Sequence, residues 1–472
     1  MSLLPIAVLV ALMFFVIRFF GADALNGASQ VSLIIASGVT IAIAIFIYGC
    51  PWSRLEENIV SNIKGIGNAM LILLLIGAIS GSWMVSGIVP TFICYGLKII
   101  SPRLFLFAVC LICALVSLLT GSSWTTIATI GVAMIAIGDA LGYSAAWTAG
   151  AIISGAYFGD KVSPLSDTTV LASSSAGTPL FTHIRYMLIT TVPSFAIALV
   201  VFLAVSLGHD PQSGLQASAM SDMLHSTFNI TPWVLIVPVL TGILIARKVP
   251  ALLTLLLASL MAGILALFAQ PDIIHGIGAY EGASSGLDFQ SGFRGLMTTY
   301  FGSTGIESGN DELNALIATN GMNGMLPTIF LIVCAATFGG TLTGSGMIQS
   351  LTDMLTRRVH GRAGLVSASV GTGIFSNMAT GDQYLSIILT CNLYRKLFEE
   401  KGYESRLLSR SAEDSATVTS VLIPWNSCGM TQSTVLHVPT VEYLPYCLFN
   451  IISPFMSIIV AAVGYKIYRK VS

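Results

Sequence analysis

Charged residues are scarce in this chain: Asp, Glu, Lys and Arg make up 9% of its 472 residues. A soluble domain carries about a quarter. The 21 basic and 22 acidic residues nearly balance, so no bulk field points to nucleic acid or an acidic partner. The eight cysteines are irregularly spaced, mostly in apolar segments, which excludes a disulfide or zinc framework. The chain has no Walker motif, and this argues against ATP-driven transport.

What the chain has instead is apolar residues, at 54% of the sequence. They form runs long enough to cross a bilayer, and the length suits roughly ten to twelve spans. The sequence therefore predicts an all-α, multi-pass protein of the cell (inner) membrane, surrounded by lipid. The run at 3–20 follows Met1 without a basic leader or a cleavage site, so we interpret it as a first span.

The two halves of the chain repeat weakly. Matching residues stand 260 positions apart, and a constant offset over more than a hundred residues is typical of transporter repeats. We predict an N-terminal repeat at 1–207, an external linker at 208–230, and a C-terminal repeat at 231–472 with an external loop at 270–325. The linker and the loop lack a regular apolar pattern and have few basic residues. The matches are Thr120-Gly121 with Thr380-Gly381, Gly142-Tyr143 with Gly402-Tyr403, and Pro164 with Pro424.

Loop charges predict that the repeats are inverted. The loop 139–144 has no basic residue, whereas its counterpart 395–410 has five. Because basic loops stay in the cytoplasm, the two loops belong on opposite sides of the membrane. The charge pattern fits best if each repeat has five spans and one re-entrant hairpin, at 104–138 and at 363–394. The hairpin tips are then 120–123 and 380–383.

The stretch 155–172 places charges and helix breakers inside an apolar region. Asp160, Lys161 and Asp167 stand there beside Gly159 and Pro164. Ionisable groups at membrane depth are costly and mark ion or substrate paths. Broken backbone is tolerated at that depth only where protein or trapped water satisfies it. Together these features predict a binding site at an unwound membrane helix.

Four polar elements are expected to converge: the two hairpin tips and the broken helices 159–169 and 424–434. Their carboxylate, hydroxyl and amide oxygens are the ligands that hard cations prefer. Burial raises the pKa of a carboxylate toward physiological pH, so one carboxylate can exchange Na⁺ for H⁺. Asp160 and Asp167 are the predicted Na⁺ ligands. The candidate ion- or substrate-binding residues are Asp160, Asp167, Ser163, Thr168, Thr169, Ser122, Ser123, Asp382, Asn426, Ser427 and Thr434.

Simpler structural interpretations stand beside these. Asp160 can form a salt bridge with Lys161, and Asp382 can cap the helix that follows it. Glu413 and Asp414 are interpreted as the start of a cytoplasmic helix. A Ser or Thr in a membrane helix often only bonds to neighbouring backbone.

A family resemblance rests on the longest of these motifs. Residues Ala149–Thr169, with Gly121-Ser122-Ser123-Trp124-Thr125 and His183-Ile184-Arg185, resemble the signature of the NhaC-type Na⁺/H⁺ antiporters. The resemblance implies inverted repeats with hairpins, Na⁺ and H⁺ as the transported ions, and no cofactor. The same family includes exchangers of malate for lactate.

Three functions are therefore weighed. The first is Na⁺/H⁺ antiport, and the second is Na⁺- and H⁺-coupled exchange of a small organic anion or an amino acid. For the second, Lys161 is the one intramembrane base expected to hold a carboxylate. The third is an intramembrane aspartyl protease using Asp160 and Asp382, but neither residue has the sequence context of that class, so we expect no enzyme. A homodimer is an open alternative to a monomer.

Overall fold

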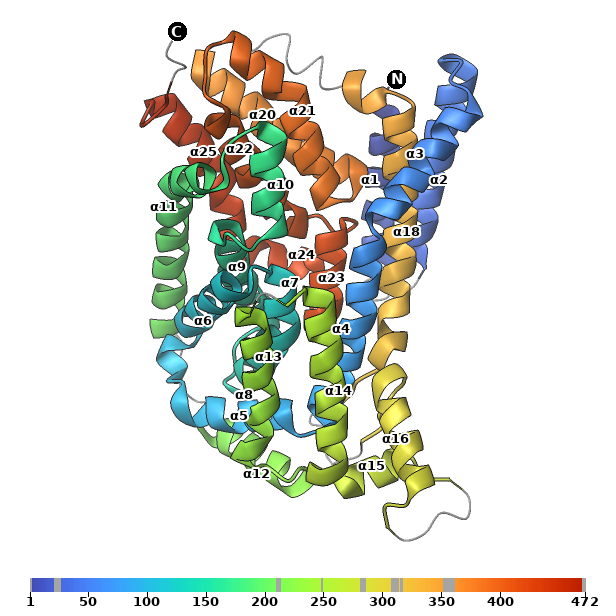
Figure 1. Ribbon diagram of the computed structural model, residues 1–472, viewed down its shortest axis with the longest axis vertical. Coiled ribbons are helices and arrows are strands. Elements are labelled where there is room, and N and C mark those ends of the chain that lie inside the picture. The colour runs from blue at the N-terminus through green and yellow to red at the C-terminus, as the bar shows by residue number, and fades with distance from the viewer. Residues whose placement is uncertain are drawn as a thin grey trace. The chain divides into compact units, whose positions relative to one another are not determined.

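The computed structural model describes residues 2–20, 27–208, 214–247, 249–280, 286–306, 314, 317–350 and 361–468. These residues form helices joined by turns, without a strand among them (Figure 1). Among the described residues, seven helices are long and apolar enough to cross a membrane, or up to nine if each bent pair counts as one span. This confirms an all-α, multi-pass membrane protein. The count is below ten to twelve because several predicted spans are shorter helices separated by breaks.

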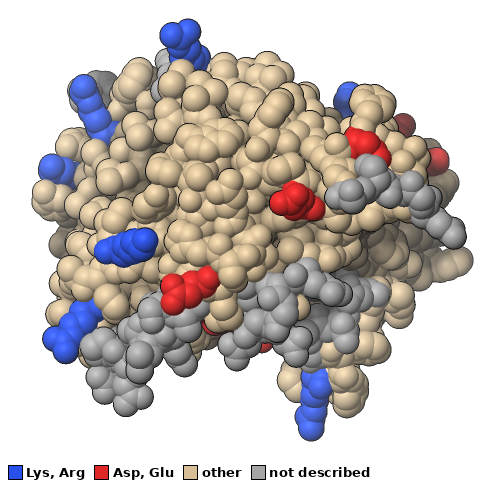
Figure 2. Space-filling view, turned by 90° about the horizontal axis from the view of Figure 1, so that it is seen from below, with Lys and Arg blue, Asp and Glu red and all other residues tan. Residues whose placement is uncertain are grey.

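The outer surface matches a lipid environment. Large apolar side chains such as Phe19, Phe46 and Phe268 are exposed, and a bilayer is the medium in which such exposure costs nothing. Charged side chains are few and scattered on the face shown in Figure 2.

The chain divides into two compact units. The first unit comprises Met1–Asn68, Tyr157–Ala198 and Pro327–Ser472, and the second comprises Ala69–Ala156 and Leu199–Leu326. Each unit contains residues from both predicted repeats, so the two compact units do not coincide with the two repeats. The predicted repeat boundaries stay a prediction.

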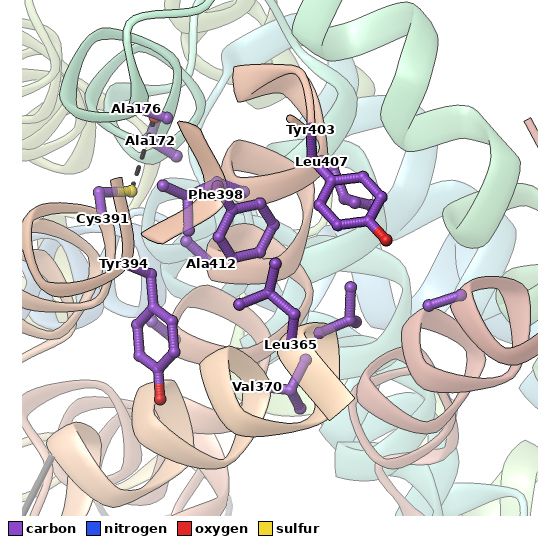
Figure 3. Close-up of a cluster of buried hydrophobic side chains, with 14 of the residues drawn as sticks. Ala172, Ala176, Leu365, Val370, Cys391, Tyr394, Phe398, Tyr403, Leu407 and Ala412 are labelled. Carbon is purple, nitrogen blue, oxygen red and sulfur yellow. Dashed lines mark hydrogen bonds between the residues drawn. The ribbon is translucent and has the colours of Figure 1, made fainter. Parts of the chain in front are cut away.

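The first unit has its core between α10, α20, α21 and α22. Tyr394 and Phe398 of α21 pack against Leu365 of α20 and Leu407 of α22 (Figure 3). The Cys391 thiol donates to a carbonyl of α10 at 3.9 Å. Helices of this unit are α1 (Leu4–Phe20), α2 (Ala28–Ala42), α3 (Trp52–Gly65), α10 (Asp167–Ala176), most of α11 (Leu180–Leu207) and α18 (Leu326–Gly344), α20 (Gly361–Thr380), α21 (Gln383–Glu400), α22 (Ser405–Ala412), α23 (Ser427–Leu436), α24 (Thr440–Tyr443) and α25 (Leu448–Val463).

The second unit contains the first predicted hairpin and the helices after the linker. Its helices are α4 (Gly67–Val85, from residue 69), α5 (Ile88–Ile99), α6 (Phe105–Thr120), α7 (Ser123–Thr126), α8 (Val132–Ala140), α12 (Gly214–Thr227), α13 (Ile236–Ala246), α14 (Ala251–Ala269), α15 (Pro271–Ile277) and α16 (Phe289–Phe301). The helix α9 (Ala145–Val162) begins in this unit and ends in the first.

The predicted linker and external loop contain helices rather than irregular chain. α12 lies in 208–230, and α15 and α16 lie in 270–325. α16 starts at a capping box, in which Asp288 and Ser291 bond to each other's backbone, a local signal that a search for apolar runs misses. Residues 209–213, 281–285, 307–313 and 315–316 of these segments lie outside the described residues.

Local geometry recurs at the predicted offset of 260. The helices α10 and α23 have ten residues each and follow a capped break. α9 ends at Val162, and the helical stretch that begins with α22 ends at Leu422. Left-handed residues recur as well: Gly121 with Gly381, Gly142 with Gly402, and Gly177 with His437. This agreement supports the internal repeat, while the inversion of the repeats stays a prediction.

Candidate functional site

The helix α9 breaks where the sequence predicts. Its last turn carries Asp160 and Lys161, and α10 begins only after Ser166. A helix end leaves carbonyl groups without intrahelical partners. Here the Thr169 hydroxyl donates to two of them, the carbonyl of Asp160 at 3.4 Å and that of Lys161 at 3.0 Å. The hydroxyl of Ser166 caps α10. The break is therefore held together by the hydroxyls that marked it in the sequence.

The two aspartates of this break lie in different surroundings. Asp160 is 6% exposed, whereas Asp167 is exposed in the first turn of α10. An acidic side chain in a first turn interacts favourably with the helix N-terminus, so Asp167 has a structural role at its position. Ser163, Thr168 and Thr169 are buried, and Thr169 bonds to the Asp160 carbonyl. The prediction that both aspartates bind Na⁺ stays a prediction, and burial favours Asp160.

Lys161 has its counter-charge on another helix. Its ammonium group forms an ion pair with Asp414 and donates to the Ser453 hydroxyl at 2.8 Å. The same carboxylate accepts from Thr190 at 3.2 Å. Lys161 and Asp414 are both fully buried. Lys161 therefore has a buried ion-pair partner, Asp414, more than 250 positions away in the sequence.

The sequence missed a second cluster around this ion pair. Arg410 is fully buried, with Nε 3.9 Å from Asp414 Oδ2 and its guanidinium stacked 4.6 Å from the ring centre of Tyr186. None of its three nitrogens has a hydrogen-bond acceptor among the described residues. His183 lies nearby and bonds through Nδ1 to Ser409 at 2.8 Å.

Glu413 belongs to the same cluster. The hydroxyls of Thr417 and Thr168 lie against its carboxylate, but neither carboxylate oxygen makes a hydrogen bond of good geometry. Glu413 and Asp414 sit in a π-helical turn, Glu413–Thr417, and both are fully buried. The interpretation of the two residues as a cytoplasmic helix start is therefore wrong. The available signal was the spacing of hydroxyls after them, at Ser415 and Thr419.

The second tip and the second break are bonded to each other. Asp382 caps α21 by accepting from the Leu385 amide at 2.8 Å. The Ser427 amide donates to the Gly381 carbonyl at 2.8 Å, and the Ser427 side chain lies against the Asp382 carboxylate. Asn426 caps α23 and also donates to the Asn377 carbonyl at 3.2 Å. These candidates form one polar junction inside the first unit.

Thr434 lies one helix length away from that junction. Its hydroxyl bonds to Thr328 of α18 at 2.6 Å, a helix-to-helix contact of the kind that hydroxyls often make in membranes. The structure therefore gives Thr434 a packing contact.

The first tip belongs to the second unit. Ser122 caps α7 and accepts from the Thr125 amide at 3.2 Å and hydroxyl at 3.1 Å. Ser123 is buried beside it. The Thr120 hydroxyl bonds across the turn to the Ser122 carbonyl at 3.3 Å and to Thr126 at 3.3 Å. In the second tip, Thr380 makes the same bonds, to the Asp382 carbonyl and to Ser386, both at 3.1 Å.

Three of the four predicted elements meet within the first unit. Tyr384, in the first turn of α21, lies within electrostatic range of Asp160, Asp167 and Asp382. Glu413 lies within the same range of Lys161 and Asp160. The break after α9, the second tip and the second break therefore surround one polar region.

This region has an excess of negative charge. Among the residues whose burial is described, only six Asp, Glu, Lys or Arg side chains are buried, and all belong to the first unit. Four of them are carboxylates and two are bases, so the formal sum is −2. Burying unbalanced charge is costly, and a bound cation or proton offsets it. The six are Asp160, Lys161, Asp382, Arg410, Glu413 and Asp414.

The chain is similar to known proteins along most of its length. A model of the Na⁺/H⁺ antiporter family matches residues 1–177 and 155–465. The Na⁺/H⁺ antiporter NhaC of Alkalihalophilus pseudofirmus is 37% identical, over 89% of this chain and 87% of that protein. NhaC of Bacillus subtilis is 34% identical, over 90% and 91%. A malate-2H⁺/Na⁺-lactate antiporter of Bacillus subtilis is also 34% identical, over 89% and 86%.

Proposed function

Because the chain belongs to the Na⁺/H⁺ antiporter family, we propose that it exchanges Na⁺ for H⁺ across the inner membrane as a secondary transporter. Membership of this family indicates a transporter. The proposal rests on one observation above all. The nearly buried carboxylate of Asp160 ends a broken helix, in a region where buried carboxylates outnumber buried bases.

Asp160 is the proposed exchange site. Asp160 lies at the end of α9, where its backbone carbonyl and that of Lys161 accept from the Thr169 hydroxyl, and Ser163 is buried three residues further on. Such oxygens suit a dehydrated Na⁺ ion. A proton on the Asp160 carboxylate removes its charge and with it the main attraction for Na⁺, so the two ions compete. Lys161 leaves this competition undisturbed because Asp414 neutralises it.

Asp382 has a second task in this scheme. Its carboxylate caps α21, and a helix N-terminus stabilises a negative charge. We propose that Asp382 shapes the site by fixing the start of α21, while Asp160 exchanges ions. Ser427 and Asn426 hold the second break against this tip.

Purified protein in vesicles tests the proposal. A Na⁺ gradient is expected to drive proton flux in the wild type and to fail in Asp160→Asn, which keeps the size of the side chain and removes the charge. Asp167→Asn is expected to retain more flux, because Asp167 is exposed. The matched control is Glu400→Gln, which removes an exposed carboxylate. Wild-type flux in both Asp160→Asn and Asp167→Asn would refute the assignment.

A second candidate function is coupled exchange of a small organic anion or an amino acid. Arg410 favours it, since its guanidinium is fully buried and has no hydrogen-bond acceptor among the described residues. A planar guanidinium is the preferred partner of a carboxylate. In this case malate or lactate inside the vesicles accelerates Na⁺-driven proton flux, and Arg410→Lys abolishes that acceleration. A homodimer stays a prediction, which the mass of the purified protein in detergent tests.

A further inference from the structure

Gln432 of α23 is a buried amide without a partner. The residue is fully buried, and neither Oε1 nor Nε2 has a hydrogen-bond partner among the described residues. A buried polar group that loses its water and gains no bond destabilises the fold. Other amides nearby are bonded: Asn377 donates to the Ala416 carbonyl at 2.6 Å, and Gln383 accepts from Ser420 at 3.0 Å. Gln432 therefore stands out within its own surroundings.

The position of Gln432 on α23 directs it toward the polar junction. Gln432 follows Cys428 by four residues, so the two side chains share one face of the helix. Side chains of a helix also lean toward its N-terminus, which here begins at Ser427 beside Asp382. The amide of Gln432 thus extends along the face that carries the Cys428 thiol.

That face borders the end of α9. The Cys428 thiol lies 2.7 Å from Gln383 Oε1, directly after the second tip. The Cys428 thiol also lies next to the Tyr157 hydroxyl, and this hydroxyl is close enough to Asp160 to interact with its charge. Tyr157 stands one turn before Asp160 on α9. The chain of contacts therefore runs from α23 to the turn that carries the proposed exchange site.

The chemistry of an amide limits the ligand. Its oxygen is a neutral, hard donor of the kind that binds Na⁺, and its NH₂ group binds carboxylates. The buried charges of this region sum to −2, which favours a cation over an anion. We propose that Gln432 supplies its amide oxygen to the transported Na⁺ and so helps to determine ion specificity. This inference rests on the proposed Na⁺/H⁺ exchange.

A role of Gln432 in Na⁺ binding and a role in folding predict different effects of its replacement on stability. An amide that serves only the fold is bonded in the Na⁺-free protein, and its loss is destabilising. An amide that serves Na⁺ is unsatisfied until the ion binds. Replacement by an apolar side chain of similar size is then expected to leave the Na⁺-free protein at least as stable as the wild type, while weakening the response to Na⁺.

The experiment compares Gln432→Leu with Asn377→Leu, whose amide is bonded. Thermal unfolding in detergent is followed in choline chloride and in increasing NaCl, and vesicle flux gives the Na⁺ concentration for half-maximal exchange. For Gln432→Leu we expect an unchanged or higher unfolding temperature without Na⁺, a smaller rise with Na⁺, and at least a fivefold higher half-maximal Na⁺. For Asn377→Leu we expect a lower unfolding temperature without Na⁺.

Several outcomes would overturn the proposal. One is a Gln432→Leu variant that unfolds early without Na⁺ yet keeps the wild-type response to Na⁺, since Gln432 is then a structural amide. Another is an altered response to malate or lactate with an unaltered response to Na⁺. If Gln432→Leu does not fold, Gln432→Met takes its place with the same expectations. Absence of Na⁺-driven flux in the wild type would refute the proposed function itself. If the wild type shows Na⁺-driven flux and the Gln432→Leu variant has the same half-maximal Na⁺ as the wild type, only this inference is refuted.

Discussion

The two helix breaks lie at equivalent positions of the two copies but bury different side chains. In the first copy, residues 145–162 lead to a break and then to α10, and in the second copy residues 405–422 lead to a break and then to α23. Asp160 and Lys161 in the first copy correspond to Ser420 and Val421. Glu413 and Asp414 in the second copy correspond to Ile153 and Ser154.

The position of the break is therefore repeated in both copies, whereas the buried charged residues differ between them. Lys161 of the first copy is neutralised by Asp414 of the second. The buried charges of the first copy, Asp160 and Lys161, formally cancel, yet Lys161 pairs with the second copy, where Glu413 and Asp414 exceed the one buried base, Arg410. The polar region of the first unit therefore depends on having both breaks in one place, and substitutions that exchange residues between the copies probe that dependence.

The largest expected effect comes from separating the shared ion pair. Asp414→Asn leaves Lys161 buried without its counter-charge, and removing one partner of a buried pair costs about 3–5 kcal/mol. We expect a large fall in the free energy of unfolding, measured by denaturant titration in detergent. The double variant Lys161→Met/Asp414→Leu is expected to recover part of it, because Arg410 still loses the neighbouring Asp414 carboxylate. Glu400→Gln, which breaks an exposed pair, should change stability little. If the double variant is as unstable as Asp414→Asn, charge pairing is not the reason for this arrangement.

The next largest effect concerns the pH dependence of ion exchange, which tests whether Asp160 of the first copy is the exchange site. A falling pH protonates Asp160, and a protonated carboxylate binds Na⁺ poorly, so half-maximal Na⁺ for exchange should rise as pH falls. Under full competition the rise approaches tenfold per pH unit, or about 1.4 kcal/mol. The measurement is vesicle flux between pH 6 and pH 9. A half-maximal Na⁺ that does not change with pH would place the proton elsewhere, with Glu413 of the second copy as the next candidate.

The tips offer a smaller and symmetrical test. Asp382 and Ser122 occupy equivalent positions, and each caps the helix after its tip. Loss of a cap costs about 1 kcal/mol, so Asp382→Ala and Ser122→Ala should each lower the unfolding free energy by about that amount. Asp382→Ser places the residue of the first tip in the second and should restore most of the stability. Should it restore none, the Asp382 carboxylate has a task beyond capping.

The smallest expected effect concerns the ends of α10 and α23. Gly177 ends α10 in the left-handed conformation, and His437 ends α23 in the same conformation at a φ of 54°. Left-handed backbone disfavours a side chain, so His437→Gly should stabilise the protein by about 0.5–1 kcal/mol. Gly177→Ala should destabilise it by a similar amount, since Arg395 also stands 3.0 Å from the new Cβ. Equal effects of opposite sign would show that the two ends are physically equivalent.

Much of this fold follows from signals that act locally. The breaks at Ser163–Ser166 and at Asn426, and the turns at Gly121 and Gly381, are set by glycine, proline and hydroxyl residues whose preferences do not depend on distant partners. These features are therefore found where the sequence predicts them. The helix α16 within 270–325 also has a local signal, but only at its N-terminus, in the capping box of Asp288 and Ser291.

The charge cluster is different because its signals are not local. Glu413 and Asp414 precede an apolar stretch, and the same pattern marks an ordinary helix start exposed to water. Arg410 follows a basic loop and looks like part of it. These residues are buried because α20, α21 and α25 pack against the π-helical turn and because α9 and α11 supply bonding partners. Asp414 pairs with Lys161 across more than 250 positions of the chain. A pairing at this separation cannot be recognised from a local stretch of sequence.

The helical stretch that carries this cluster has no outer face. Every residue from 407 to 421 is buried, whereas α11 alternates between exposed positions such as Val200 and buried ones such as Ala198. Tolerance to substitution should therefore follow the helical period along α11 but stay low without interruption from 407 to 421. In evolutionary terms, the second copy has little freedom to drift at this stretch, and changes in ion preference are more accessible through the partly exposed positions of the first break.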